Sequence, residues 1–211
     1  MAELLFIRPM DDSAASLSAA IGARIIRHIQ SHLPDWNFFS VNDLSGSANA
    51  SRASVDAALE QDHKHLFYFG HGTVSSLVAN GEALIDETNL RALPDSAVVV
   101  AVACRSAAGL GAASRGVVRA YLGWIDALPI PHLHPQPMLA ALFDGLATLF
   151  QGATVDICEQ KLKREFAEAY RAYRDWEPPA SVGEGGKLYA TMAPAFAEYC
   201  LRVMGDRSAV L

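Results

Sequence analysis

The sequence predicts an α/β fold in which helices flank a central, mostly parallel β-sheet. Three observations lead to this prediction. Apolar segments of strand length alternate with segments of helical periodicity along the first half of the chain. The run "AVVVAVA" (97–103) is apolar at every position, which is typical of a central parallel strand covered on both faces. Asn80-Gly81 stands between apolar flanks and predicts a small β-hairpin, because a type I′ turn requires positive φ at both central residues.

The segment before the hairpin is expected to form alternating strands and helices. Short apolar or aromatic runs predict strands at 3–7, 36–41 and 65–69. A long helix is expected after Asp12-Ser13, a pair suited to capping its N-terminus. A loop at 45–51, rich in Gly, Ser and Asn, leads into a second, shorter helix.

The segment after the hairpin turns increasingly helical. A short helix is expected to start at Asp86 or Thr88 and to run through Leu93. The remaining elements are expected in this order: strands at 97–103 and 118–124, a proline-rich loop at 130–137, and helices at 138–150, 155–174 and 187–203. Thr154 is the expected N-cap of the second of these helices, and 177–186 is expected to be a flexible link.

Length and composition indicate one globular domain over residues 1–211. Of the 211 residues, 51% are hydrophobic and 19% are charged, which suits a buried core of ordinary size. The net charge of −6 and the absence of a Lys/Arg run argue against a nucleic-acid partner, whose phosphates would need cationic side chains. No stretch approaches the length of a membrane span, and the N-terminus does not resemble a secretory signal.

The three cysteines, Cys104, Cys158 and Cys200, are an odd number without CxxC spacing. This usage suits a reducing compartment, so a cytoplasmic location is expected. Cys158 and Cys200 lie in helical patterns and are interpreted as core residues.

No cofactor and no metal are expected. The stretch "GLGAASRG" has neither GxGxxG nor GxxxxGK[ST] spacing, which argues against a nucleotide site. Two histidine pairs, His63/His65 and His132/His134, could bind a metal, but no carboxylate or thiolate completes either set. Solvated loop histidines are the preferred interpretation.

The chemistry-bearing residues follow two apolar strands. His71-Gly72 comes after the strand at 65–69, and Cys104 ends the run at 97–103. Carboxyl ends of parallel strands share one sheet edge, so His71 and Cys104 would emerge side by side if their strands are neighbours. A thiolate is a nucleophile and an imidazole is an acid/base group, while the amides of Gly72 and Cys104 could stabilise an oxyanion. Taken singly, a lone His or Cys at such a position is more often structural.

A strand ending in His-Gly followed by a strand ending in Cys resembles the caspase-like cysteine peptidases of clan CD. The segments "FYFGHG", "ALIDETNLRALPDSAVVVAVACRSAAGLG" and "AYLGW" are most similar to the bacterial CHAT and gingipain-like branches, and the resemblance covers roughly residues 60–125. Caspases fit less well, because Val102 replaces their glutamine and His71 lies only 104 − 71 = 33 residues before the cysteine, against about 50 in caspases.

The resemblance implies a caspase-like three-layer sandwich with the small β-hairpin inserted after the His-Gly loop. It implies a His71/Cys104 catalytic dyad, an oxyanion hole from the Gly72 and Cys104 amides, and Asp126 as a loosely mapped acidic residue that selects Arg or Lys at P1. It also implies a cysteine endopeptidase acting on protein or peptide substrates in a bacterial defence or cell-death switch, under the control of an activating partner or an oligomer. The alternatives are a catalytically silent interaction or sensor module and, more weakly, a doubly wound ligand-binding domain.

Overall fold

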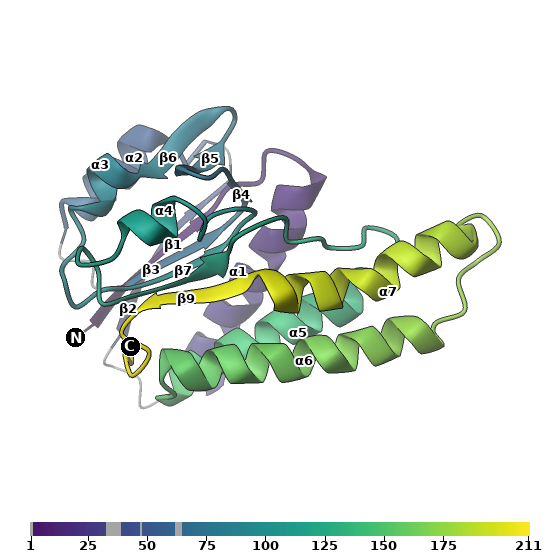
Figure 1. The fold of residues 1–211 in the computed structure, drawn as a ribbon. Coiled ribbons are helices and arrows are strands. Elements are labelled where there is room, and N and C mark those ends of the chain that lie inside the picture. Colours follow the sequence, from purple (N-terminus) through teal and green to yellow (C-terminus); the bar gives the residue numbers. More distant parts are fainter. Residues whose placement is uncertain (1, 33–38, 47, 62–64) are drawn as a thin grey trace.

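The computed structural model describes residues 2–32, 39–46, 48–61 and 65–211. Its centre is a six-stranded sheet with the strand order β2-β1-β3-β7-β8-β9 (Figure 1). The strands are β1 (Ala2–Arg8), β2 (Phe39–Ser45), β3 (His65–Phe69), β7 (Val98–Val102), β8 (Ala120–Trp124) and β9 (Leu201–Gly205). All neighbouring pairs are parallel except β8 and β9, which are antiparallel. The predicted α/β class with a mostly parallel sheet is confirmed.

Helices cover both faces of the sheet, so the molecule has three layers (Figure 1). One face carries α1 (Ser13–His32), α5 (Gln136–Leu146), the 3₁₀ helix η1 (Ala147–Gln151), α6 (Val155–Asp175) and α7 (Gly183–Cys200). The opposite face carries α2 (Arg52–Leu59), α3 (Glu87–Leu90) and α4 (Leu110–Ala113). Successive strand residues alternate between the two cores: Leu4 and Phe6 pack in the first, Leu5 and Ile7 in the second. Both faces are buried, which explains the continuous apolar runs.

The predicted hairpin is present and joins a second, smaller sheet. Strands β4 (His71–Gly72), β5 (Ser76–Ala79) and β6 (Glu82–Asp86) are antiparallel neighbours. Asn80 and Gly81 have φ of 50° and 79°, the positive values that a type I′ turn requires. The His-Gly pair is therefore the first strand of the inserted hairpin sheet.

The predicted helix starts are confirmed by side-chain caps. The Asp12 carboxylate accepts the Ala15 N–H at 2.8 Å at the start of α1. Asp86 forms a capping box with Asn89 at the start of α3, and the Thr154 hydroxyl accepts the Ile157 N–H at 3.3 Å at the start of α6. Of the two predicted starts for the short helix, Asp86 is the one used, and the helix ends at Leu90 rather than Leu93.

Other predicted bounds are also wrong. The strand expected at 36–41 is β2, which extends to Ser45; residues 36–38 lie outside the described residues. The helix expected at 187–203 begins at Gly183, inside the segment expected to be a flexible link, and ends at Cys200. Residues 201–205 form the edge strand β9 because they pair with β8, from Trp124↔Leu201 to Ala120↔Gly205. Such long-range pairing overrides local helical periodicity.

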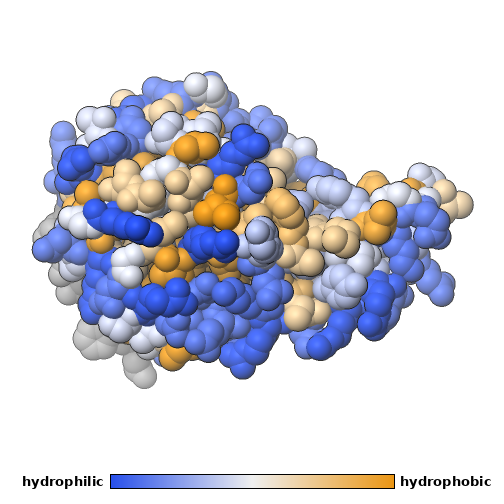
Figure 2. All heavy atoms as spheres, in the orientation of Figure 1, coloured by the Kyte–Doolittle hydropathy of each residue, from blue (hydrophilic) through white to orange (hydrophobic). Residues whose placement is uncertain are grey.

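Helix α7 faces the core with its small residues. Ala190, Ala193 and Ala197 are buried, and the Trp124 indole N–H donates to the Ala197 carbonyl at 2.9 Å. The larger apolar side chains point outward, with Met192 53% and Tyr199 71% exposed. Figure 2 shows this apolar surface beside the charged surface of α6. None of the helices in the described ranges is long and apolar enough to cross a membrane.

Candidate active site

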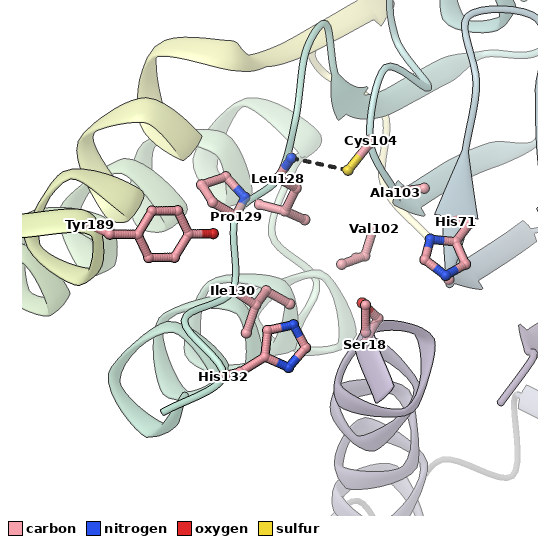
Figure 3. A pocket seen from close by; sticks show the side chains of 12 residues that line it. Ser18, His71, Val102, Ala103, Cys104, Leu128, Pro129, Ile130, His132 and Tyr189 are labelled. Carbon is pink, nitrogen blue, oxygen red and sulfur yellow. Dashed lines mark hydrogen bonds between the residues drawn. The ribbon is translucent and has the colours of Figure 1, made fainter. Parts of the chain in front are cut away.

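The strands that precede His71 and Cys104 are neighbours in the sheet. β3 and β7 are parallel, with Phe69 beside Val102, and the Gly70 N–H donates to the Val102 carbonyl at 3.2 Å. His71 and Cys104 therefore emerge at the same sheet edge, where both line a cavity of about 160 Å³ (Figure 3).

The Cys104 sulfur is half-buried and accepts the Leu128 backbone N–H at 3.3 Å (Figure 3). A donor aimed at sulfur stabilises the negative charge of a thiolate. The following residue, Arg105, has a φ of 56°, a left-handed conformation that is uncommon outside glycine. Its N–H donates to the Asp126 carbonyl at 2.9 Å, which ties the turn after the cysteine to the loop after β8. The loop after β8 thus contacts both the sulfur and the residue that follows it.

The imidazole of His71 pairs with a carboxylate. Its Nε2 lies 2.7 Å from Oδ2 of Asp12, which leaves Nδ1 as the nitrogen open to a substrate. The hydrogen bond from the Ala15 N–H lowers the pKa of Asp12, and the His71 ring lowers it further. Partial desolvation acts in the opposite direction, but the pKa stays below its ordinary value. An ionised Asp12 orients the ring through this contact. The sequence predicts only a helix cap for Asp12, although its place just after the first strand indicates the same sheet edge.

Gly72 lies directly against the backbone of Cys104. A Cβ on Gly72 would come within 2.4 Å of the Cys104 carbonyl oxygen and 3.0 Å of the Ala103 side chain. Any side chain here would therefore push the two loops apart. The glycine brings together the two backbone segments whose amides are expected to face the substrate.

Asp126 lies outside the cavity lining. Its carboxylate accepts the N–H of Ala127 at 2.8 Å and is 3.5 Å from the guanidinium Nε of Arg105. The structure therefore brings His71, Gly72 and Cys104 together and leaves Asp126 as a neighbour of the Arg105 turn. The acidic lining expected for a basic P1 side chain is not found among the described residues that surround this cavity.

The remaining histidines and cysteines have other environments. His65 is buried at the start of β3 and its Nδ1 accepts the Val98 N–H at 3.1 Å, so its interpretation as a solvated loop residue is wrong. His63 lies outside the described residues. His132 lines the cavity, and His134 stacks on Trp176 with ring centroids 4.9 Å apart. Cys158 and Cys200 are buried, as predicted.

Within the described ranges, metal-ligand atoms gather in the group Asp11, Asp12 and His71, whose donor atoms lie within 4.8 Å of one another. Asp12 and His71 already bind each other, and Oδ2 of Asp11 accepts the Asn80 N–H at 2.8 Å, while Oδ1 of Asp11 is buried without a hydrogen-bond partner among the described residues. We therefore assign no metal to the group.

Similarity to known proteins is found at the level of solved structures. No protein-family model and no curated protein matches the chain. The crystal structure of gingipain R, an Arg-specific cysteine proteinase, matches over 99% of this chain with a TM-score of 0.59 and 13% identity. The chain has the caspase-like fold of the gingipains. A structure described as a protease matches over 99% of the chain with a TM-score of 0.62 and 14% identity.

A third structure, the complex of the pro- and mature domains of RgpB from Porphyromonas gingivalis, matches with a TM-score of 0.53 and 13% identity. The chain covers 47% of gingipain R and 48% of each of the other two chains, so it spans about half the length of the structures it matches. At this identity the gingipain likeness shows the fold, and the chemistry has to be argued from the site.

Proposed function

We propose that the chain is a clan CD cysteine endopeptidase of the CHAT or gingipain-like kind, with Cys104 as nucleophile and His71 as acid/base. The observation that carries this proposal is the single cavity that both residues line, with Leu128 donating to the sulfur and Asp12 paired with the imidazole. Nucleophile, base and a third residue that orients the base are the parts that thiol-dependent acyl transfer needs. The likeness to cysteine proteinase structures supports the same reaction class.

In the first step the Cys104 thiolate attacks the carbonyl carbon of the scissile peptide and forms a C–S bond. The negative charge that develops on the carbonyl oxygen is stabilised by the backbone amides of Gly72 and Cys104. The C–N bond then breaks, and the His71 imidazolium gives its proton to the leaving amine. The Asp12 carboxylate stabilises the imidazolium before this transfer, as expected from its 2.7 Å contact with Nε2.

In the second step a water molecule hydrolyses the thioester. His71, now neutral, takes a proton from the water as it attacks the acyl carbon. The C–S bond breaks, the N-terminal half of the substrate leaves as a carboxylic acid, and the thiolate is restored. Apart from the substrate and this water molecule, the cycle uses only groups of the chain.

We propose that the activity serves a regulated bacterial proteolytic switch, in defence or cell death, and that a protein partner or an oligomer controls it. The pairing of pro- and mature domains recorded for RgpB is one example of protein-level control on this fold. Cys104, Cys158 and Cys200 form no disulfide, which is consistent with a protein that acts in the reducing cytoplasm.

The experiment that tests this function is cleavage of a fluorogenic peptide library by the wild type, Cys104→Ala, His71→Ala and Cys158→Ala. Cys158→Ala is the matched control, because it removes a thiol that is buried in α6 and contacts the Gly145 carbonyl of α5. Turnover lost in the first two variants and kept in the third supports the proposal. Thermal melts of all four proteins separate loss of chemistry from loss of folding.

Turnover that survives in Cys104→Ala would overturn the proposal. Absence of turnover in the wild type is resolved by alkylating the folded protein. Rapid, His71-dependent labelling of Cys104 supports a peptidase that awaits activation, and slow labelling independent of His71 supports a catalytically silent interaction module instead.

A further inference from the structure

The cavity beside Cys104 indicates which substrate side chain the site accepts, which the catalytic residues alone do not. It is about 160 Å³ in volume and is bounded by α1, the end of β7, the loop after β8 and α7 (Figure 3). Besides the catalytic pair, the side chains that shape it belong to Ser18, Val102, Leu128, Ile130, His132 and Tyr189.

The position of the cavity relative to the sulfur indicates which part of a substrate enters it. His71 protonates the leaving amine, so the leaving half of the substrate lies on the imidazole side of Cys104. The acyl half then lies on the other side, toward Leu128 and Ile130 (Figure 3). The P1 side chain is attached one carbon away from the carbonyl that Cys104 attacks, so it is the group that this cavity receives. This step rests on the proposed function.

The lining carries no carboxylate, ammonium or guanidinium among the described residues. The neighbouring acids are committed elsewhere, since Asp12 pairs with His71 and Asp126 lies beside Arg105. Arg24, on the same helix as Ser18, lies over the ring of Phe143 at 3.8 Å. A charged P1 side chain would therefore lose its hydration without gaining an ion pair, which is unfavourable.

Part of the cavity wall is apolar. Val102 is fully buried, and Leu128 and Ile130 are only 8% and 9% exposed. A space of about 150 Å³ is large enough to hold benzene, so this cavity of about 160 Å³, which Ser18, His132 and Tyr189 also line, can accept a side chain of the size of Leu, Met or Phe. Such a side chain gains from leaving water in proportion to the apolar area it buries.

We propose that this site selects an uncharged, apolar P1 residue of medium size, and that it does not select Arg or Lys. His132 and Ser18 lie at the polar part of the lining and tolerate the polar backbone next to P1. The volume and the apolar walls, rather than a counter-charge, set the preference.

The test compares fluorogenic tetrapeptides that share P2 to P4 and differ at P1 as Leu, Met, Phe, Arg, Lys, Asp or Glu. We expect kcat/KM for the apolar set to exceed that for the charged set by about 10- to 100-fold. A preference for Arg or Lys, with turnover still dependent on Cys104 and His71, overturns this inference and leaves the proposed function standing. A preference for Asp or Glu that grows as pH falls also overturns it and points to protonated His132 as the determinant.

Peptide ketones that alkylate an active-site cysteine provide the second readout, which needs no turnover. We expect the Leu ketone to label Cys104 faster than the Arg ketone, as followed by intact mass. If no peptide is cleaved and no ketone labels Cys104, the proposed function and this inference are both overturned. A preference for a charged P1 residue overturns this inference alone, so the two results are distinguishable.

Ser18→Asp places a carboxylate in the cavity from α1. We expect it to raise the ratio of Arg to Leu turnover by at least about tenfold, since a buried hydrogen-bonded ion pair discriminates strongly. Asp126→Asn is the matched control: it removes a nearby carboxylate outside the lining and should leave the order of P1 residues unchanged. Each variant is judged by the ratio of its turnover of two substrates. An unfolded fraction lowers both turnover values equally, so the ratio does not change. An unchanged ratio in Ser18→Asp would show that P1 lies elsewhere.

Discussion

Asp12 combines two roles that are visible at the level of single atoms. One oxygen accepts the Ala15 N–H and caps α1, and the other lies 2.7 Å from Nε2 of His71. The same carboxylate therefore begins a helix and orients the proposed base. The two roles differ in what they require, because a cap needs only an acceptor oxygen whereas stabilising an imidazolium needs the negative charge.

Asp12→Asn separates the two roles. Asn caps helices about as well as Asp, so we expect the free energy of unfolding to change by less than about 0.5 kcal/mol. Turnover should fall by about 10- to 100-fold, since the imidazolium loses its counter-charge. Steady-state kinetics and urea unfolding of the wild type, Asp12→Asn and Asp12→Ala measure both quantities. Unchanged turnover in Asp12→Asn would leave the residue a cap alone.

Gly72→Ala tests how closely the two loops must approach. The added Cβ would lie 2.4 Å from the Cys104 carbonyl oxygen, so the backbone has to move. We expect a loss of about 1 to 3 kcal/mol in stability and a fall of more than about tenfold in turnover. Gly185→Ala, where no atom lies within 4 Å, is the control and should keep wild-type activity. Equal behaviour of the two variants in melts and kinetics would contradict the close approach.

Among the elements, α2, the hairpin and α3 are joined by one guanidinium. Arg52 at the start of α2 pairs with Asp56 at 2.9 Å and with Asp86 at 2.7 Å, and donates to the Ala83 carbonyl at 3.1 Å. Asp86 at the end of β6 also caps α3. This arrangement connects the hairpin sheet that begins at His71 to the helices α2 and α3 of the second core face.

Asp86→Ala is expected to lower stability by about 1 to 3 kcal/mol, because it removes a helix cap and an ion-pair partner together. The exposed neighbour Glu87→Ala removes only the exposed pair with Arg91 and should cost less than about 1 kcal/mol. Urea unfolding of both variants measures the difference. Equal losses would show that the Asp86 cap contributes little.

The stability difference between the wild type and Asp86→Ala depends on pH in a way that follows from the direction in which the pKa of Asp86 is shifted. Arg52 holds the pKa of Asp86 below its ordinary value of 3.8. A lowered folded-state pKa means that the stabilisation is fully present above pH 3.8 and is lost as the pH falls through the lower folded value. The difference in free energy of unfolding between the wild type and Asp86→Ala should therefore be constant around neutral pH and become smaller below about pH 4.

At the scale of the whole molecule, packing divides the three thiols into two classes. Burial raises the pKa of Cys158 to about 12 and raises that of Cys200, whereas Cys104 lies in an open cavity. Iodoacetamide should add one group to the native protein, at Cys104, and three to the unfolded protein, as counted by intact mass. Native Cys104→Ala should gain none. Two or more additions to the native wild type would contradict the burial of α6 and α7.

Much of the architecture could be predicted because it depends on local patterns. The apolar runs, the Asn80-Gly81 turn and the capping residues each carry their signal within a few positions. The edge strand β9 could not be predicted, because "LRVMG" becomes a strand only by pairing with β8, about 80 residues earlier in the sequence. The outward apolar face of α7 was equally hidden, since periodicity locates an apolar stripe but not the partner that it faces.

What the sequence by itself determined is the α/β class, the parallel core strands and the placing of His71 and Cys104 at strand ends, because hydrophobic patterning over a few residues marks which segments are buried strands and where they end. Only the tertiary structure decided that Asp12 meets His71, that Leu128 donates to the sulfur, and that Asp126 lies beside Arg105 rather than in the cavity. These contacts join residues 21 to 59 positions apart. They depend on how loops from different strands converge at one edge, which no local pattern encodes.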